Sequence, residues 1–282
     1  MKRIHTILII LLLAVTYGEA KKSSDDRQMD DFITSLMKKM TLEEKIGQLN
    51  LGGVGSPKVV GSAIGLDEAI RKGLVSSVGG FDAKAAEDAQ KFAVENSRMK
   101  IPLITGLDVV HGYYTIFPIP LASACSWNMP LLEESARVAA DEASAFGINW
   151  TFAPMVDICR DPRWGRIAEG AGEDPCLGSR IGRAMVRGFQ GDDLSKPNTL
   201  LPCVKHFALY GASEAGRDYN TVSMDPVTMY NYYLPPYKAA FDEGAGSGMT
   251  SFNVVNGVPA TGNKWLLTDL LRDQWKFKGF ME

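Results

Sequence analysis

The sequence predicts an α/β fold built on a parallel sheet. Six amphipathic segments with helical spacing alternate with short apolar runs that are flanked by turn residues. Several of these runs are apolar almost throughout, which is typical of strands buried on both faces. No hairpin signal joins them, so crossover helices should connect successive parallel strands. For a chain of 282 residues, an open doubly wound sheet and a (β/α)8 barrel both satisfy this pattern.

The helices follow one another along the chain, and two of them carry clear boundary signals. Thr41 and Glu44 form a capping box, in which each side chain accepts a hydrogen bond from the other residue's backbone N–H. Gly147 is expected just past the end of the third helix, where glycine closes a helix most easily. The helices are predicted at 41–49, 82–98, 131–146, 178–189, 226–243 and 264–275, and the strands at 46–51, 75–81, 102–110, 149–158, 200–209, 248–255 and from 277 onward.

The first twenty residues resemble a secretory signal peptide. Lys2 and Arg3 precede an apolar run at 7–15 that is too short to span a bilayer. Gly18 and Ala20 then provide the small residues of a cleavage site. We therefore expect cleavage near Ala20, a polar N-terminal segment at 21–35, and a periplasmic or secreted protein. The rest of the sequence contains no apolar run long enough to predict a membrane span.

Charge and cysteine usage argue against several classes of function. The formal charge is −3, from 30 basic and 33 acidic residues without a basic block, so nucleic-acid binding is not expected. The four cysteines have no C-x-x-C spacing, and neither a disulfide scaffold nor a metal site is expected. The glycine-rich segment 244–248 precedes a strand, and 257–264 lacks the end of a phosphate loop. No cofactor is therefore expected, and the absence of G-x-S-x-G argues against a serine hydrolase.

Polar side chains gather where the apolar runs end. The carboxyl ends of parallel strands share one edge of a sheet, and ligands bind at that edge in both candidate folds. Lys205 and His206 lie within an otherwise apolar segment, 200–209, where burying an unpaired charge would cost on the order of several kcal/mol. We therefore expect a polar ligand or a carboxylate beside them. The strand-end residues are Asp108, Asp157, Arg160, Lys205, His206 and Asn253.

The loop at 157–166 is dense in charge. It contains three arginines, two aspartates and a tryptophan, and three further acids follow by residue 174. Most of these charges should neutralise one another, with Asp161, Glu169, Glu173 and Asp174 opposite the arginines, while one or two reach the ligand. Guanidinium groups beside carboxylates and a flat ring suit a neutral polyhydroxylated ligand. A carbohydrate therefore fits this loop better than a phosphate.

Five motifs carry a family resemblance. They are Gly106-Leu-Asp-Val-Val-His-Gly112, Arg160-Asp-Pro-Arg-Trp-Gly-Arg166, Gly172-Glu-Asp-Pro175, Lys205-His-Phe-Ala-Leu-Tyr-Gly211 and Asn256-Gly-Val-Pro-Ala-Thr261. In this order they resemble the signature set of glycoside hydrolase family 3, and the wider resemblance extends from Leu36 to Phe280. Leu234-Pro-Pro-Tyr-Lys238 is similar to the periplasmic β-glucosidase branch of that family. Each motif alone is moderately specific, whereas five in the family's order are very specific.

The resemblance implies a (β/α)8 TIM-barrel-like domain over residues 36–282, incomplete at its C-terminus with about six to seven β/α units. In the full-length protein an α/β sandwich domain would follow it. The implied activity is retaining hydrolysis of terminal non-reducing β-D-glucosyl residues from β-linked glucosides or oligosaccharides. Asp108 would hold hydroxyls on the far side of that sugar. Arg166, Lys205 and His206 would grip its ring hydroxyls, and Met249 would border the same subsite.

The sequence departs from the family pattern after Lys278-Gly-Phe280. The family continues with two residues and then a Ser/Thr-Asp pair whose aspartate is the nucleophile, whereas this chain has the two residues, Met281 and Glu282, and stops about two residues short of that aspartate. We therefore expect no catalytic residue in the chain, and the nucleophilic aspartate just beyond Glu282. Glu282 should not replace it, because residues two apart in a strand lie roughly 6–7 Å apart, one layer from the required position. Such an incomplete barrel should aggregate or dimerise through open strand edges.

Other interpretations stay open. A β-xylosidase or another exo-β-glycosidase would share these motifs and differ in what Asp108 tolerates near C6 of the sugar. A non-catalytic sugar-binding truncation product would keep the subsite without hydrolysis. A hexosaminidase is disfavoured, because the amino-sugar branch of the family places an Asp–His pair in the loop that follows Lys205-His-Phe. Here that loop, 211–220, contains no histidine.

Overall fold

The computed structural model describes residues 24–53, 64–79 and 83–282, so the predicted signal peptide lies outside the described residues. Contacts divide the chain into two compact units, Met1–Ile46 and Gly47–Glu282. The described part of the first unit contains α2 (Ser24–Lys39), and α3 (Leu42–Gly47) begins after it. The capping box is confirmed, because Thr41 N–H donates to Glu44 Oε2 at 2.9 Å and Glu44 N–H donates to Thr41 Oγ1 at 3.2 Å.

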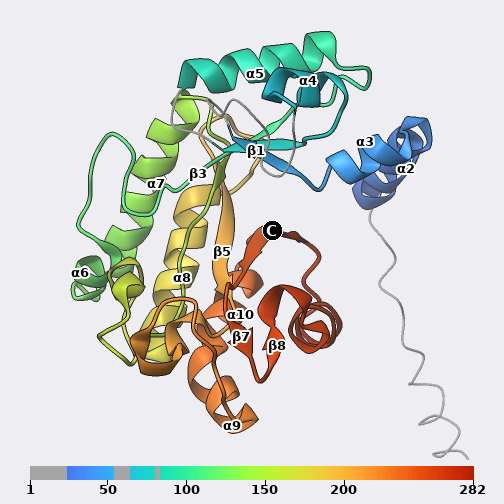
Figure 1. Ribbon diagram of the computed structural model, residues 1–282. Coiled ribbons are helices and arrows are strands. Elements are labelled where there is room, and N and C mark those ends of the chain that lie inside the picture. The colour runs from blue at the N-terminus through green and yellow to red at the C-terminus, as the bar shows by residue number, and fades with distance from the viewer. Residues whose placement is uncertain (1–23, 54–63, 80–82) are drawn as a thin grey trace, which may run out of the picture. The chain divides into compact units, whose positions relative to one another are not determined.

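The second unit is organised around a seven-stranded sheet (Figure 1). Its strands are β1 (Leu51–Gly53), β2 (Ser77–Gly79), β3 (Ile104–Leu107), β4 (Trp150–Thr151), β5 (Leu201–Phe207), β6 (Ser247–Thr250) and β9 (Phe280–Met281). They lie side by side in chain order, and each neighbouring pair is parallel. A doubly wound sheet reverses its strand order at a switch point. The sequential order is that of a (β/α) barrel, so the predicted fold class is confirmed.

Helices connect the parallel strands, as crossover connections require. α4 (Leu66–Arg71) and α5 (Ala83–Asn96) precede β2 and β3, while α7 (Met129–Ala145), α8 (Pro175–Gln190) and α10 (Pro235–Asp242) precede β4, β5 and β6. The last three pack in a row (Figure 1). α6 (Pro120–Ala124) and α9 (Pro226–Thr228) are short. Within the described ranges, no helix combines the length and apolar character needed to cross a membrane.

The segment 226–243, predicted as one helix, is divided. α9 is followed by a π-helical stretch, Met229–Tyr233, and α10 starts at Pro235. Proline has no backbone N–H to donate to the preceding turn, and two consecutive prolines interrupt the α-helical pattern here. The helix predicted at 264–275 is also π-helical, from Trp265 to Gln274. Short 3₁₀ turns lie at Gly165–Glu169, Tyr210–Ala212, Glu214–Gly216 and Ala260–Gly262.

A hairpin that the sequence analysis does not identify lies outside the seven-stranded sheet. β7 (Val254–Val255) pairs antiparallel with β8 (Val258–Pro259). Asn256 and Gly257 join them with φ angles of 49° and 85°, the positive values that a type I′ turn requires and that Asn-Gly favours. The Asn-Gly pair is the sequence feature that could have predicted this hairpin. Strands of two residues are too short to show an alternation of apolar and polar residues. The strand predicted at 248–255 accordingly ends at Thr250.

A large apolar core surrounds β5. Every residue of this strand from Pro202 to Phe207 is buried, as a strand covered on both faces should be. Val204 and Phe207 belong to a cluster that also contains Tyr237 of α10 and Leu266 of the π-helix. Phe207 and Tyr237 meet edge to face, with ring centroids 5.5 Å apart. The core therefore fixes the position of β5, the strand that carries Lys205 and His206.

Candidate functional site

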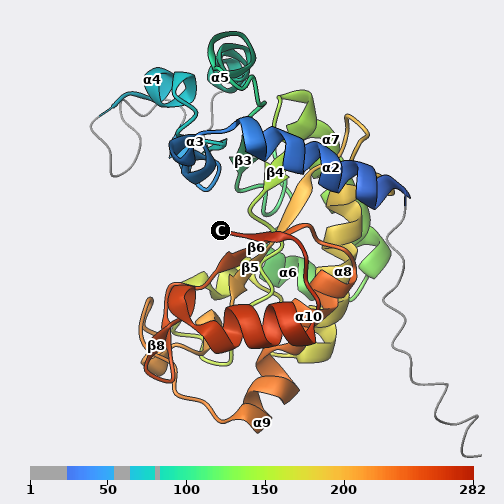
Figure 2. The ribbon, with the colours of Figure 1, turned by 90° about the vertical axis from the view of Figure 1, so that its right-hand side faces the viewer.

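The five candidate binding residues lie at or beyond the carboxyl ends of the strands. Asp108 directly follows β3, Lys205 and His206 lie near the end of β5, and Met249 is on β6. Arg166 lies in the 3₁₀ turn that follows β4. Figure 2 shows β4, β5 and β6 next to one another in the sheet. The parallel order therefore brings residues far apart in sequence to one edge.

Asp108 and Lys205 form an ion pair with unequal exposure. Lys205 Nζ donates to Asp108 Oδ1 at 2.6 Å. The Lys205 side chain is 3% exposed, whereas that of Asp108 is 55% exposed. A buried ammonium needs a partner. The sequence predicts a polar ligand or a carboxylate beside Lys205, and Asp108 is that carboxylate. Much of the Asp108 side chain remains open to solvent.

A register shift in β5 places two residues beside Met249. Val204 pairs with Gly248 and Phe207 pairs with Thr250, so Lys205 and His206 together face one residue of β6. Bulges of this kind redirect side chains and are common next to active sites. Met249 is half-buried at this position. It therefore lies alongside the two polar residues of β5.

His206 is buried and held by Asp157 and Tyr237. Asp157 Oδ2 accepts from the His206 backbone N–H at 2.9 Å and lies 3.0 Å from Nδ1 of its ring. The Tyr237 hydroxyl lies 2.5 Å from Asp157 Oδ1 and 2.8 Å from the His206 carbonyl oxygen. Burial lowers the pKa of His206, and the opposing effect of Asp157 does not reverse that shift. His206 is therefore neutral near pH 7.

Arg166 is fixed by Glu169 and by the ring of Tyr210. Its Nε and Nη2 donate to the two carboxylate oxygens of Glu169 at 2.7 and 2.8 Å. Its guanidinium carbon lies 5.6 Å from the centre of the Tyr210 ring. The same ring meets His206 edge-on, with centroids 5.2 Å apart. Burial would raise the pKa of Glu169, but Arg166 outweighs it and the pKa is lowered. Tyr210 therefore links Arg166 to His206.

The charged loop after β4 is self-neutralised in part: of the four acids expected opposite arginines, Asp161 pairs with Arg163 and Glu169 pairs with Arg166. Arg163 donates to both oxygens of Asp161, and these hydrogen bonds lower the pKa of Asp161 to about 2. Asp174, expected opposite an arginine, instead caps α8 by accepting from Leu177 N–H at 2.7 Å. Loop spacing does not show which acid lies at a helix start, although the Asp-Pro pair at 174–175 is a signal for one.

Three residues of the cluster are not identified by sequence reasoning: Tyr210, Asp218 and Tyr237. Asp218 accepts from Trp164 Nε1 at 3.1 Å and from the Tyr210 hydroxyl. Burial, reinforced by Asp218, raises the pKa of Tyr210. Tyr210 and Tyr237 lie within motifs of the family resemblance, which is the sequence feature that could have identified them. Their contacts depend on the fold.

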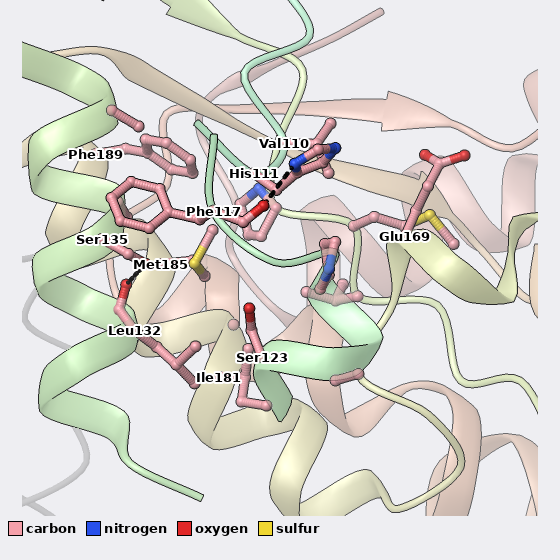
Figure 3. Close-up of a pocket in the computed structure, with 18 of the residues that line it drawn as sticks. Val110, His111, Phe117, Ser123, Leu132, Ser135, Glu169, Ile181, Met185 and Phe189 are labelled. Carbon is pink, nitrogen blue, oxygen red and sulfur yellow. Dashed lines mark hydrogen bonds between the residues drawn. The ribbon is translucent and has the colours of Figure 1, made fainter. Parts of the chain in front are cut away.

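A small cavity borders this cluster without including it. Its volume is about 40 Å³, enough for a few water molecules. Asp108, Arg166, Lys205, His206 and Met249 do not line it. Figure 3 shows its largely apolar wall, with Phe117, Leu132, Ile181 and Met185 around the space and Glu169 to one side. The cavity lies between α7, α8 and the segments that follow β3 and β4, and the polar cluster remains the candidate site.

The cluster is suited to a neutral polar ligand. Arg166 and Lys205 are cationic donors, Asp108 is an acceptor, and neutral His206 offers a ring nitrogen. In the part of the chain that the structure describes, no group of three or more potential metal ligands occurs. The charged residues are paired within the cluster, so a ligand that brings hydroxyls rather than net charge preserves the balance.

A comparison with protein families shows what kind of domain carries this cluster. The model of the glycosyl hydrolase family 3 N-terminal domain matches residues 41–281. The chain belongs to glycosyl hydrolase family 3. The family 3 resemblance of the motifs is thereby confirmed over nearly all of the described residues.

Individual relatives place the chain among glycosidases of this family. The periplasmic beta-glucosidase of Salmonella typhimurium is 47% identical over 255 residues, which cover 89% of this chain and 32% of that protein. A putative beta-xylosidase of Formosa agariphila is 31% identical, over 94% of this chain and 38% of that protein. A beta-glucosidase from Listeria innocua, solved with isofagomine, has a TM-score of 0.82 and 44% identity over 89% of this chain and 36% of its own. The chain thus spans about a third of the length of these relatives.

Proposed function

We propose that this family 3 chain carries the glucose-binding subsite of an exo-β-glucosidase. The full-length protein would hydrolyse terminal non-reducing β-D-glucosyl residues of β-glucosides or oligosaccharides, with retention of configuration. The observation that carries the proposal is the polar cluster formed by the Asp108–Lys205 pair, Arg166 and His206. Relatives support it, because the Listeria innocua beta-glucosidase has been solved with glucose and, as a mutant, with laminaribiose.

The cluster supplies the partners that sugar hydroxyls need. Lys205 and Arg166 would donate to ring hydroxyls, and Asp108 would accept from hydroxyls on the far side of the sugar. Charge-assisted hydrogen bonds of this kind contribute about 1.5–3 kcal/mol each. Met249 would border the sugar ring. Binding energy gained at these hydroxyls can be used to distort the reacting ring toward its oxocarbenium-like transition state.

The nucleophile and the acid/base are proposed to follow Glu282 in the full-length protein. β9 runs parallel to β6, with Met281 beside Gly248, so the chain leaves β9 toward the carboxyl end of β6, the strand next to β5. Burial and the charge of Asp108 raise the pKa of Glu282, which does not favour an ionised nucleophile there. We also propose that residues 36–282 form the barrel-type domain and that an α/β sandwich domain follows.

Export is part of the proposal. Residues 1–20 would act as a signal peptide, cleaved near Ala20, and the mature protein would be periplasmic or secreted. The name of the Salmonella typhimurium relative supports a periplasmic location. Intact mass and N-terminal sequencing of the protein purified from its source would test this step. A mature N-terminus that retains the apolar run 7–15 would contradict it.

The test of the activity uses the full-length protein with p-nitrophenyl β-D-glucoside. Asp108→Ala should lower kcat/KM about ten- to 150-fold, the equivalent of one charge-assisted hydrogen bond. Asp192→Ala is the matched control, because this aspartate has a 95% exposed side chain and forms a surface ion pair with Lys196 at 3.6 Å. No glucose release by the wild type, or equal kcat/KM for the two variants, would overturn the proposal.

A β-xylosidase is the second candidate function. Beta-xylosidases of Formosa agariphila match the chain at 31% and 32% identity. The two activities differ in the C6 hydroxymethyl group, which a xyloside lacks. A kcat/KM for p-nitrophenyl β-D-xyloside higher than for the glucoside would favour this candidate. Glucose binding by a full-length protein that hydrolyses neither substrate would instead indicate a non-catalytic sugar-binding protein.

A further inference from the structure

The carboxylate of Asp157 is buried among neutral hydrogen-bond donors. Its side chain is 0% exposed, and that of His206 is 1% exposed. Its hydrogen bonds come from the His206 backbone, the His206 ring and the Tyr237 hydroxyl. The nearby cations are engaged elsewhere, since Lys205 pairs with Asp108 and Arg166 pairs with Glu169. Burying a carboxylate in such surroundings is unfavourable unless its lone pairs are used.

This arrangement fixes which nitrogen of His206 carries the proton. An ionised carboxylate accepts hydrogen bonds and cannot donate them. Because Asp157 Oδ2 lies 3.0 Å from Nδ1, Nδ1 carries the hydrogen. In the neutral ring the other nitrogen, Nε2, then has a free lone pair. It is the nitrogen that remains for a ligand.

Tyr237 completes the network from α10. Its hydroxyl has one hydrogen and two acceptors in reach, Asp157 Oδ1 at 2.5 Å and the His206 carbonyl oxygen at 2.8 Å. Burial and Asp157 raise the pKa of Tyr237 well above its usual range, so the phenol stays protonated. The hydroxyl ties the Asp157 side chain to the His206 backbone. It also disperses the carboxylate charge, which makes Asp157 a weaker partner for an imidazolium ring.

We infer that Asp157 and Tyr237 are positioning residues that hold His206 in the tautomer with Nε2 unprotonated, so that His206 accepts a hydrogen bond from a hydroxyl of the bound sugar. The inference rests on the proposed function of the site. It assigns to His206 a role opposite to that of its neighbour Lys205, which donates. The subsite would then select a ligand that has one hydroxyl donating to His206 and one hydroxyl accepting from Lys205.

The charges around His206 give the two positioning residues opposite effects on its titration. Asp157 favours the imidazolium, whereas Arg166 and Lys205 disfavour it. Glu169 also faces this charge cluster, and the neutral phenols of Tyr210 and Tyr237 contact the histidine. Asp157→Asn keeps the shape and removes the negative charge, so the pKa of His206 should fall. Tyr237→Phe concentrates the charge on Asp157, so the pKa of His206 should rise.

The experiment measures glucose affinity of the full-length protein by calorimetry between about pH 5 and 8, where histidines titrate. Affinity should fall on acidification, because protonation at Nε2 removes the acceptor. Asp157→Asn should move the midpoint of this loss to lower pH by about one unit, and Tyr237→Phe should move it to higher pH. Tyr233→Phe, a buried tyrosine that lies one helical turn earlier, is the matched control and should leave the midpoint in place.

Two results would overturn the inference. In the first, Asp157→Asn and Tyr237→Phe weaken glucose binding equally at every pH and leave the midpoint of the pH dependence unchanged. The network would then have a structural role only. Affinity that rises on acidification would make Nε2 a donor. Histidine NMR, with the signal assigned by His206→Gln, follows the titration without glucose. Opposite midpoint shifts in a protein that binds no glucose would therefore refute the proposed function and leave the tautomer assignment standing.

Discussion

Breaking the Asp108–Lys205 pair from its two sides should affect stability unequally. The two side chains share one 2.6 Å hydrogen bond, but Lys205 is 3% exposed and Asp108 is 55% exposed. Asp108→Ala leaves a buried ammonium without its partner. Lys205→Met removes the buried charge and leaves a carboxylate that water can solvate. Both substitutions remove the same hydrogen bond, so any difference between them reports the desolvation of the partner left behind.

The magnitudes follow from the surroundings of Lys205. Removing one partner of a buried ion pair typically costs about 3–5 kcal/mol. Glu169 and Glu282 also feel the charge of Lys205, so part of its stabilisation survives, and we expect about 2–3 kcal/mol for Asp108→Ala. Methionine keeps the length and the apolar contacts of the lysine stem. We therefore expect a loss of about 1 kcal/mol or less for Lys205→Met.

The assay is urea denaturation of the full-length protein, with the midpoint of the same transition compared across variants. The double variant Asp108→Ala/Lys205→Met removes both charges of the pair and should unfold like Lys205→Met alone. Two results would refute the reasoning. One is a Lys205→Met variant as unstable as Asp108→Ala, and the other is a double variant whose loss equals the sum of the single losses.

Three further predictions concern packing, recognition and thiol exposure. Gly188→Ala should lower the free energy of unfolding by about 1–3 kcal/mol, because its Cβ would lie 2.4 Å from the Glu133 carbonyl oxygen. Gly262→Ala is the control, because its Cβ would meet nothing within 4 Å. Equal urea midpoints for the two variants would contradict this prediction. Arg166→Lys should weaken glucose binding about tenfold, because lysine cannot make the two-point contact with the Glu169 carboxylate that fixes Arg166 in the site. Calorimetry measures the Kd, and an unchanged Kd would count against the proposed site. Alkylation mapped by mass spectrometry should label the exposed Cys125 and Cys176 and spare the buried Cys159 and Cys203. Fast labelling of Cys203, whose pKa burial raises to about 12, would show that β5 opens.

The order of the elements could be predicted from local pattern, whereas the strand lengths could not. The run at 149–158 is apolar and is predicted as one strand, but β4 covers only Trp150–Thr151. Pro154 donates no hydrogen bond to a neighbouring strand, and beyond it the chain rejoins β5 through the bridge between Met155 and Lys205. An apolar run indicates burial. Ladder pairing also depends on the register with the neighbouring strands, which pair with β4 only at Trp150 and Thr151, and the apolar pattern does not record register.

The need for carboxylate partners could be predicted, but the identity of the partners could not. Lys205 and His206 lie in an apolar segment, which is a local property of the sequence. Asp108 is 97 residues from Lys205, Asp157 is 49 residues from His206, and Tyr237 is 80 residues from Asp157. Which acid meets which base is decided by the registers of β3, β4 and β5 and by the docking of α10. None of these quantities can be predicted from a short window of sequence.

The register shift in β5 explains how two consecutive residues serve one cluster. In a regular strand, Lys205 and His206 would point to opposite faces of the sheet, and strict alternation would have excluded one of them. Because two residues of β5 face one residue of β6, Lys205 reaches the aspartate that follows β3 while His206 reaches the aspartate that follows β4. Each base thus takes its carboxylate from a different strand. The register shift thus lies at the two consecutive residues whose carboxylate partners come from different strands, both of which belong to the candidate site.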